Sequence, residues 1–420
     1  MPVGSEDVVA AAVISRVWVT SMALTSHFFI TPYDTSAITH SNSIFSAFAA
    51  WDGVYFVDIA ADGYRYENTH AFFPLFPLLV RWTSVLFTPF VDETAALLVA
   101  GWCISNVCFV LAAHYLHLLG RVLLKNDALA TRAALFFCFC PSGIFMSSCY
   151  SESLMCFLSF CGMYLLELYR TASSSSSRRY LHLFLSALLF GLASATRSNG
   201  LLLSLYIAYY RLCDSPHPVT DFPRFFVHWI VTACLGVVAI GLQLVYFVYG
   251  IAAYCPSHQP YLSMVQQVFV IDSKLTQDRP WCANVIPNFS AMYMFIQHEY
   301  WGVGPFAYYQ LKQIPNFLLA GPMISLAAYS VVTLRHPTLR PYIVHIAFLL
   351  ANALVVVHIQ VITRFLAASP PIFWAAATLL DDVKSATSTS LSWLGHGLVL
   401  YFLIFNVVGA TLFPSFYPWT

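Results

Sequence analysis

The sequence predicts an all-α integral membrane protein in which residues 1–420 form a single domain. Hydrophobic residues make up 59% of the chain and charged residues only 9%, whereas soluble domains average about 45–50% and about 25%. Many apolar stretches are long enough for a helix to cross the hydrocarbon core, which takes about 20 residues. Helices are expected because a lipid-exposed segment must satisfy its own backbone hydrogen bonds. The chain is therefore expected to be polytopic.

About eleven transmembrane helices are expected. The first apolar stretch is too long for the core of a cleavable signal peptide, so we expect it to be retained as a span. Residues 71–90 are also apolar, but their three prolines and central Arg81 favour a bent segment that does not cross the bilayer. The expected spans lie near residues 8–30, 94–119, 133–148, 153–170, 181–196, 199–213, 226–252, 315–334, 341–360, 364–380 and 393–413.

The distribution of basic residues supports this topology. If residues 71–90 do not cross, eleven Lys and Arg residues fall on one side and seven on the other, and the richer side is expected to be cytosolic. The eleven are Arg121, Lys125, Arg132, Arg170, Arg178, Arg179, Arg211, Arg224, Arg335, Arg340 and Lys384. Two long polar segments, about residues 31–93 and 254–314, then lie in the lumen. Cys255 and Cys282 bracket part of the second segment and could form a disulfide in an oxidising lumen.

The sequence also argues against several other classes of function. Lys+Arg and Asp+Glu are equal at 19 each, whereas a nucleic-acid-binding protein needs a basic face. Neither the GxxxxGK[ST] nor the GxGxxG nucleotide-binding pattern occurs. The eleven cysteines show no Cys/His spacing typical of a metal site. The polar luminal segments are therefore where we expect the chemistry.

Asp52 is the first candidate for catalysis. It follows Trp51 in the segment after the first expected span. Glycosyl transfer with inversion needs a carboxylate that takes the proton of the attacking hydroxyl, and a leaving phosphate needs nearby cations or backbone donors. Asp52 could equally cap a helix N-terminus, because Asp is a favoured capping residue. We expect Asp58, Asp62 and Glu67 to have supporting or solvated roles.

Arginines at the ends of expected spans are candidates for contacts with a phosphate. Arg197 in ATRSNG and Arg364 in QVITRF could either bind substrate or extend to lipid headgroups. Arg65 could bind phosphate or pair with Asp62. Glu152 in YSES could be a second carboxylate of the site or a helix cap.

The luminal segments also contain aromatic and histidine candidates. His298, Tyr300 and Trp301 suit the stacking and hydroxyl contacts of a sugar, but they equally suit an aromatic belt at the membrane interface. His70 in ENTH could contact substrate, although a lone histidine is more often structural.

Five stretches, in order along the chain, resemble the GPI mannosyltransferase 2 family. They are WDGVYFVDIAADGYRYENTHAFFPLFPL, FCPSGIFMSSCYSES, ATRSNG, HEYWGVGPFAYYQLKQIPNFLLAGP and HIQVITRF. The resemblance implies a multi-pass GT-C type glycosyltransferase of the endoplasmic reticulum membrane with a luminal active site. It implies transfer of the second mannose from dolichyl-phosphate-mannose to the mannosyl-glucosaminyl-(acyl)phosphatidylinositol precursor, through an α-1,6 linkage and with inversion.

The resemblance also implies roles for individual residues. Trp51 and Asp52 match the Trp-Asp pair that follows the first span in the family, which implies that Asp52 is the catalytic base. The expected substrate-binding residues are Trp51, Arg65, His70, Glu152, Arg197, His298, Tyr300, Trp301 and Arg364. The arginines are the expected phosphate contacts and the aromatic residues the expected sugar contacts. No metal or other cofactor is implied, and an accessory subunit is a further partner that the family allows.

Three rival functions remain at this point. The nearest is a dolichyl-phosphate-mannose-dependent mannosyltransferase with another acceptor. A lipid scramblase or transporter would use the acids and arginines to line a pathway, but it predicts inverted repeats, which the sequence does not show. A non-catalytic subunit would retain the apolar spans without needing the Trp-Asp pair.

Overall fold

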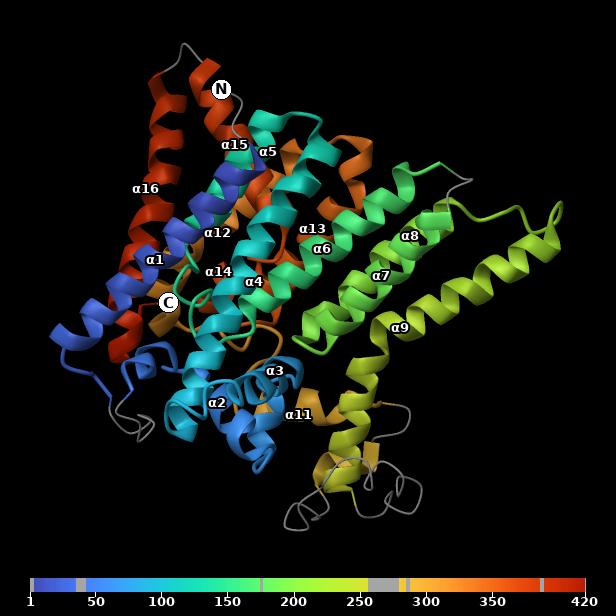
Figure 1. The fold of residues 1–420 in the computed structure, drawn as a ribbon. Coiled ribbons are helices and arrows are strands. Elements are labelled where there is room, and N and C mark those ends of the chain that lie inside the picture. Colours follow the sequence, from blue (N-terminus) through green and yellow to red (C-terminus); the bar gives the residue numbers. More distant parts are fainter. Residues whose placement is uncertain are drawn as a thin grey trace.

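The computed structural model describes residues 4–34, 43–173, 177–255, 279–284, 288–385 and 389–419. Within these ranges the chain is helical and contains no β-strand (Figure 1). Among the described residues, seven helices are long and apolar enough to cross a membrane. They are α1 (Ser5–Phe29), α4 (Glu93–Leu124), α6 (Glu152–Thr171), α9 (Phe222–Tyr254), α12 (Ile314–Thr333), α13 (Arg340–Val355) and α16 (Thr389–Leu412). The polytopic, all-helical class predicted from the composition is therefore confirmed, but the number of eleven spans is not.

The remaining expected spans correspond to helices that do not meet these criteria. They are α5 (Asp127–Cys138), α7 (Ser177–Ser194), α8 (Ser204–Cys213) and α15 (Pro370–Ser385). The expectation of one helix over residues 133–148 is wrong, because α5 ends at Cys138 and buried turns follow to residue 151. Pro141 explains this ending, since proline has no backbone N–H to donate and clashes with the preceding helical turn.

A buried arginine holds these turns in place. Arg16 lies in the middle of α1, where its Nη1 donates to the carbonyl oxygen of Gly143 at 2.7 Å and to the hydroxyl oxygen of Ser147 at 2.9 Å. Its guanidinium also lies 3.7 Å from the centre of the Phe109 ring. Irregular backbone at membrane depth is tolerated only where protein groups satisfy it. Arg16 therefore positions the residues that lead into α6. No role for this residue was predicted from the sequence.

We expect Arg16→Met to destabilise the protein. The substitution keeps much of the apolar stem but removes the donors to buried acceptors, and each acceptor left unsatisfied costs about 1–3 kcal/mol. The midpoint of thermal unfolding in detergent should fall clearly. Arg224→Met is the matched control, because the Arg224 side chain is 82% exposed and its pair with Asp221 contributes little. Equal midpoints for the two variants would contradict this role of Arg16.

The two polar segments expected in the lumen meet at one end of the bundle. Figure 1 shows α2 (Asp52–Asp62), α3 (Leu75–Ser84) and α11 (Ala291–Glu299) gathered there. The ten-residue α3 is about 15 Å long and too short to cross, as its prolines predict. Cys255 and Cys282 form the disulfide that their positions suggested. They belong to a second, smaller hydrophobic core with residues such as Tyr246, Trp281 and Met292.

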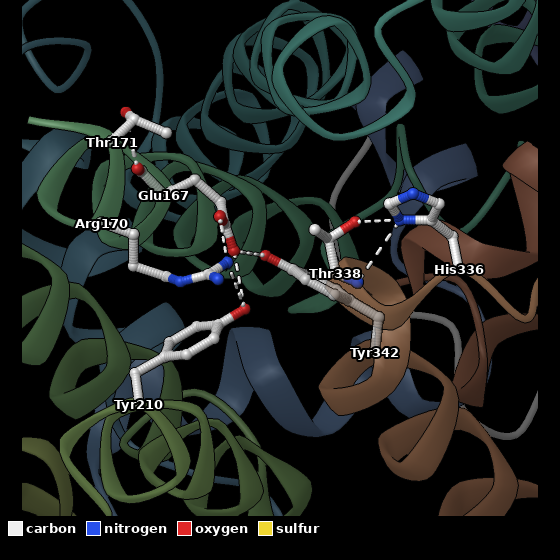
Figure 2. A network of polar contacts seen from close by, with 7 residues as sticks. All are labelled: Glu167, Arg170, Thr171, Tyr210, His336, Thr338 and Tyr342. Carbon is white, nitrogen blue, oxygen red and sulfur yellow. Dashed lines mark hydrogen bonds and ion pairs between the residues drawn. The ribbon is translucent and has the colours of Figure 1, made fainter. Parts of the chain in front are cut away.

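A polar network holds the opposite end of α6 (Figure 2). The buried Glu167 carboxylate accepts hydrogen bonds from Arg170 at 2.8 Å, from Tyr210 of α8 at 2.8 Å and from Tyr342 of α13 at 2.9 Å. Glu167 is fifteen residues beyond Glu152, which is about 22 Å along a helix. This carboxylate therefore joins three helices far from the polar end and has a structural role.

Candidate active site

Four ionic side chains form a continuous chain of alternating charge near the two polar segments that were expected in the lumen. Arg364 Nη1 donates to Asp52 Oδ2 at 2.7 Å and lies 3.8 Å from Glu152 Oε1. Arg197 Nη1 lies 2.5 Å from the same Glu152 oxygen. The structure thus brings together four predicted site residues from four separate motifs, and their formal charges cancel. We call Asp52, Arg364, Glu152 and Arg197 the ionic chain.

The start of α2 presents Asp52 to the ionic chain. Asp52 is the first residue of the helix, and Trp51 occupies the capping position without a side-chain cap hydrogen bond. The Asp52 carboxylate bonds to Arg364 instead. The alternative that Asp52 is the helix cap is therefore wrong. An acid in the first helical turn is still favoured by the helix dipole.

Trp51 has a strained backbone, with φ at 56°. A residue other than glycine in this region costs on the order of 1–3 kcal/mol, and such strain clusters at functional sites. The conformation turns the chain sharply into α2. The Trp51 side chain is 42% exposed and its ring centre lies 6.0 Å from that of Phe416, which leaves part of the indole open to a substrate.

The turns after α5 hold the residues around Asp52. The Cys149 N–H donates to the Phe48 carbonyl oxygen at 2.8 Å, and the Tyr150 hydroxyl donates to the Ala50 carbonyl oxygen at 3.1 Å. A side chain at Gly53 would meet the Tyr150 ring at 3.2 Å, so glycine allows this close packing. The segment before α2 and the segment before α6 are therefore fixed to each other.

Arg364 is anchored by both charge and aromatic contacts. It lies on the short helix α14 (Ile362–Phe365), between α13 and α15. Its guanidinium lies 4.9 Å from the centre of the Phe145 ring and 5.8 Å from that of Tyr150. Burial lowers the pKa of Arg364, but the charges of Asp52 and Glu152 raise this pKa by more than burial lowers it. The net shift is therefore upward. Arg364 therefore stays cationic.

Side-chain exposure separates the roles available to the four residues. Asp52 is 29% exposed, Arg197 25% and Arg364 18%, whereas Glu152 is only 1% exposed. A substrate can therefore reach the first three without rearrangement. Glu152 is positioned to orient the two arginines rather than to touch a substrate.

Arg197 lies just beyond the C-terminal end of α7. It precedes the short helix η3 (Ser198–Leu203), and the neighbouring Ala195 carbonyl oxygen accepts the N–H of Leu75 at 3.0 Å. The Ser198 hydroxyl accepts a hydrogen bond from Tyr293 of α11 at 2.9 Å. Both polar segments expected in the lumen therefore contact the ATRSNG motif.

Glu67 is buried, which its polar neighbours in the sequence did not indicate. Its carboxylate accepts hydrogen bonds from Trp281 Nε1 at 2.9 Å and from the Tyr300 hydroxyl at 2.8 Å, and Arg279 Nε lies 3.8 Å away. The bond to Glu67 and partial burial raise the pKa of Tyr300. Glu67 therefore joins the first polar segment to the second. Tyr300 was predicted to contact a sugar, but its hydroxyl donates its hydrogen bond to Glu67.

Three other predicted contacts lie apart from the ionic chain. His70 is fully buried, and its ring is stacked 4.4 Å from that of Tyr64. Neither of its ring nitrogens has a hydrogen-bond partner among the described residues, and burial lowers its pKa to about 3. Arg65 pairs with Asp62 at 2.8 Å, which is one of its two expected roles. His298 is exposed at the end of α11.

The predicted contact Trp301 is partly buried beside α2. Its ring centre lies 5.8 Å from that of Tyr55 and 5.9 Å from that of Phe72, in edge-on contacts. Trp301 therefore packs the second polar segment, to which it belongs, against the first, and it lies outside the ionic chain. Among the described residues, no three His, Cys, Asp or Glu side chains are grouped so that they could hold a metal ion.

The fold is that of a known class of membrane glycosyltransferases. The chain is similar to an Archaeoglobus fulgidus oligosaccharyltransferase, AglB, solved with an inhibitory peptide and a dolichol-phosphate, with a TM-score of 0.52 and 11% identity. The match covers 95% of this chain and 56% of the AglB chain. The apo form gives a TM-score of 0.53 at 12% identity, over 95% and 56% of the two chains. This likeness shows the fold alone and agrees with the expected GT-C type.

The chain belongs to the mannosyltransferase (PIG-V) family, whose model matches residues 19–341 and 332–420. It is 31% identical to a GPI mannosyltransferase 2 of Drosophila melanogaster, over 88% of this chain and 86% of the relative. It is 30% identical to a GPI alpha-1,6-mannosyltransferase 2 of Rattus norvegicus, over 90% and 88%. The human protein of the same name is 32% identical, over 79% and 73%. The resemblance drawn from the five motifs is confirmed, and the chain is a mannosyltransferase.

Proposed function

We propose that the chain adds the second mannose during assembly of the glycosylphosphatidylinositol anchor. The donor is dolichyl-phosphate-mannose, and the acceptor is the mannosyl-glucosaminyl-(acyl)phosphatidylinositol precursor. The new bond is an α-1,6 linkage, formed with inversion at the anomeric carbon. The names of the relatives support the step, and the dolichol-phosphate bound to a protein of the same fold supports the class of donor.

The observation that carries the proposal is the pairing of Asp52 with the partly exposed Arg364, which Glu152 links to a second partly exposed arginine, Arg197. The 6-hydroxyl oxygen of the acceptor mannose attacks the anomeric carbon of the donor. Asp52 takes the hydroxyl proton as the new bond forms, and the bond to the dolichyl phosphate oxygen breaks. The leaving phosphate keeps the bonding electrons and gains negative charge, which Arg364 and Arg197 stabilise.

Donor binding would also free the base. In the structure the Asp52 carboxylate is engaged by Arg364 Nη1. Arginine has five N–H donors and binds phosphate well, often with two parallel hydrogen bonds. A donor phosphate that takes over Arg364 would leave Asp52 available for the acceptor hydroxyl. Glu152 would keep both arginines in place during this exchange, because it contacts each of them.

Two features support a luminal site in the endoplasmic reticulum membrane. The Cys255–Cys282 disulfide fits an oxidising compartment. Trp281, beside this disulfide, donates to Glu67 in the same segment as Asp52. This contact links the disulfide to the segment that carries Asp52, and the expected topology puts both on the side opposite the loops that carry most of the basic residues.

The test is complementation of cells that lack the second mannosyltransferase of this pathway. Expression of the chain should restore GPI-anchored proteins at the cell surface and remove the accumulated one-mannose intermediate. A mock-transfected line and a line that lacks the third mannosyltransferase step are the controls. Persistence of the one-mannose intermediate, with the protein present in the membrane, would overturn the proposal. A change in another mannolipid instead would favour a different acceptor.

A further inference from the structure

A second polar cluster lies outside the ionic chain. The Tyr308 hydroxyl donates to Gln360 Oε1 at 2.8 Å, and Asn316 Nδ2 donates to the Tyr308 hydroxyl oxygen at 2.7 Å. Asn316 Nδ2 also lies 2.7 Å from Gln313 Oε1 and 3.4 Å from Gln360 Oε1. We call Tyr308, Gln313, Asn316 and Gln360 the amide cluster. It joins the stretch that leads into α12 to residues just before α14.

A short stretch of helix connects the amide cluster to Arg364. Gln360 belongs to the short helix η9 (Ile359–Val361), which runs directly into α14. Residues four positions apart lie on the same side of a helical segment, so Gln360 and Arg364 share one side. Asn316, Gln360 and Thr363 also line one small cavity, whose other walls are apolar. A ligand held by Arg364 would therefore place its neighbouring groups within reach of this cluster.

The bonds inside the cluster leave several polar groups unused. Gln360 and Gln313 accept through their carbonyl oxygens, which leaves both of their NH₂ groups without a partner among the described residues. The Asn316 carbonyl oxygen likewise accepts no hydrogen bond in the described part of the chain. The unused groups are thus two NH₂ groups, each with two N–H donors, and one carbonyl acceptor, and none carries a charge. Sugar hydroxyls, which both donate and accept, match such a set.

An aromatic pair borders the cluster. The His358 ring is stacked on the Tyr308 ring at 4.6 Å. Tyr308 is almost fully buried, whereas His358, Asn316 and Gln360 are partly exposed. Burial lowers the pKa of His358, so its ring is neutral near pH 7. The cluster itself and the aromatic pair that borders it are therefore uncharged, which favours contacts with a neutral sugar over contacts with an ionic group.

We propose that the amide cluster is a subsite for the hydroxyl groups of a neutral hexose beside Arg364. This proposal rests on the proposed function, because it assigns Arg364 to the donor phosphate. The hexose is either the mannose of the donor or a sugar of the acceptor glycan, and both present the same hydroxyl chemistry. The cluster sets sugar specificity, whereas the ionic chain carries out the transfer.

The test measures KM separately for dolichyl-phosphate-mannose and for the one-mannose acceptor in membranes that contain Gln360→Ala or Asn316→Ala. Each loss of a hydrogen bond should raise KM for one of the two substrates about three- to tenfold, with kcat nearly unchanged. The substrate affected identifies the hexose. Gln310→Ala is the matched control, because Gln310 is an exposed glutamine of the same stretch whose amide donates only to Ala307.

Substrate analogues that each lack one hydroxyl separate binding from a purely structural role. The wild-type protein should discriminate against one of these analogues, and Gln360→Ala or Asn316→Ala should lose that discrimination. Unchanged KM values would overturn the proposal, and so would equal weakening of all analogues together with a lower unfolding midpoint. Each of these two outcomes can be told apart from failure of the proposed function. If the proposed function were wrong, the wild-type protein itself would transfer no mannose to this acceptor.

Discussion

Asp52→Asn should lower the rate of mannose transfer about 100- to 10,000-fold, the usual contribution of a general base. Asparagine has the same shape and can still accept the hydrogen bond from Arg364, but it cannot take a proton from the acceptor hydroxyl. Abundance of the variant in the membrane should therefore be close to that of the wild type. The measurement is the initial rate of transfer to the one-mannose acceptor per amount of protein.

Asp58→Asn is the matched control for Asp52→Asn. Asp58 lies six residues further along the same helix and is exposed. Partial burial and the nearby charge of Asp62 raise the pKa of Asp58, so it resembles a functional carboxylate in this respect while lying outside the ionic chain. We expect its transfer rate to stay near the wild-type value. Full activity of Asp52→Asn, or an equal loss in both variants, would remove Asp52 as the base.

Glu152→Gln should reduce both stability and transfer. Glu152 is a buried carboxylate between Arg197 and Arg364, and its removal leaves two cations without their shared partner. Breaking a buried ion pair typically costs about 3–5 kcal/mol, although neighbouring Asp52 offsets part of this for Arg364. The midpoint of thermal unfolding should fall, and KM for the donor should rise in the fraction that remains folded.

Glu93→Gln provides the comparison for Glu152→Gln. Glu93 also lies in the first turn of a helix, α4, but it is exposed. Its replacement should change the unfolding midpoint and the donor KM only slightly. If Glu152→Gln behaved in the same way, the two arginines would not depend on Glu152 for their positions.

The sequence contained the members of the site but not their pairing. Arg197 and Arg364 were predicted because a charged group at the end of an apolar span is costly unless it has a function. Asp52 was predicted because inverting transfer needs a base and because the Trp-Asp pair resembles that of the family. Glu152 was predicted as a possible second carboxylate of the site. The bond between Asp52 and Arg364 joins residues 312 positions apart, and no local pattern specifies it. Whether Asp52 caps a helix or faces the site likewise depended on Arg364, a partner in a distant segment.

Long-range contacts also explain what the sequence did not reveal. Glu67 follows an exposed tyrosine in a polar stretch, which is typical of a solvated acid, yet Trp281 and Tyr300 bury it. Arg16 lies in an apolar run that gives no indication of the carbonyl groups it meets on another segment. The end of α5 could have been predicted from Pro141, but the apolar residues around it suggested a continuous span.

The central claim is that Asp52 serves transfer of mannose to the one-mannose GPI precursor. The most direct measurement incubates membranes that contain the wild-type chain or Asp52→Asn with labelled dolichyl-phosphate-mannose and this acceptor. We expect a labelled two-mannose lipid from the wild type, cleavable by an α-1,6-specific mannosidase, and almost none from Asp52→Asn. A labelled two-mannose lipid formed equally by both proteins would contradict this claim.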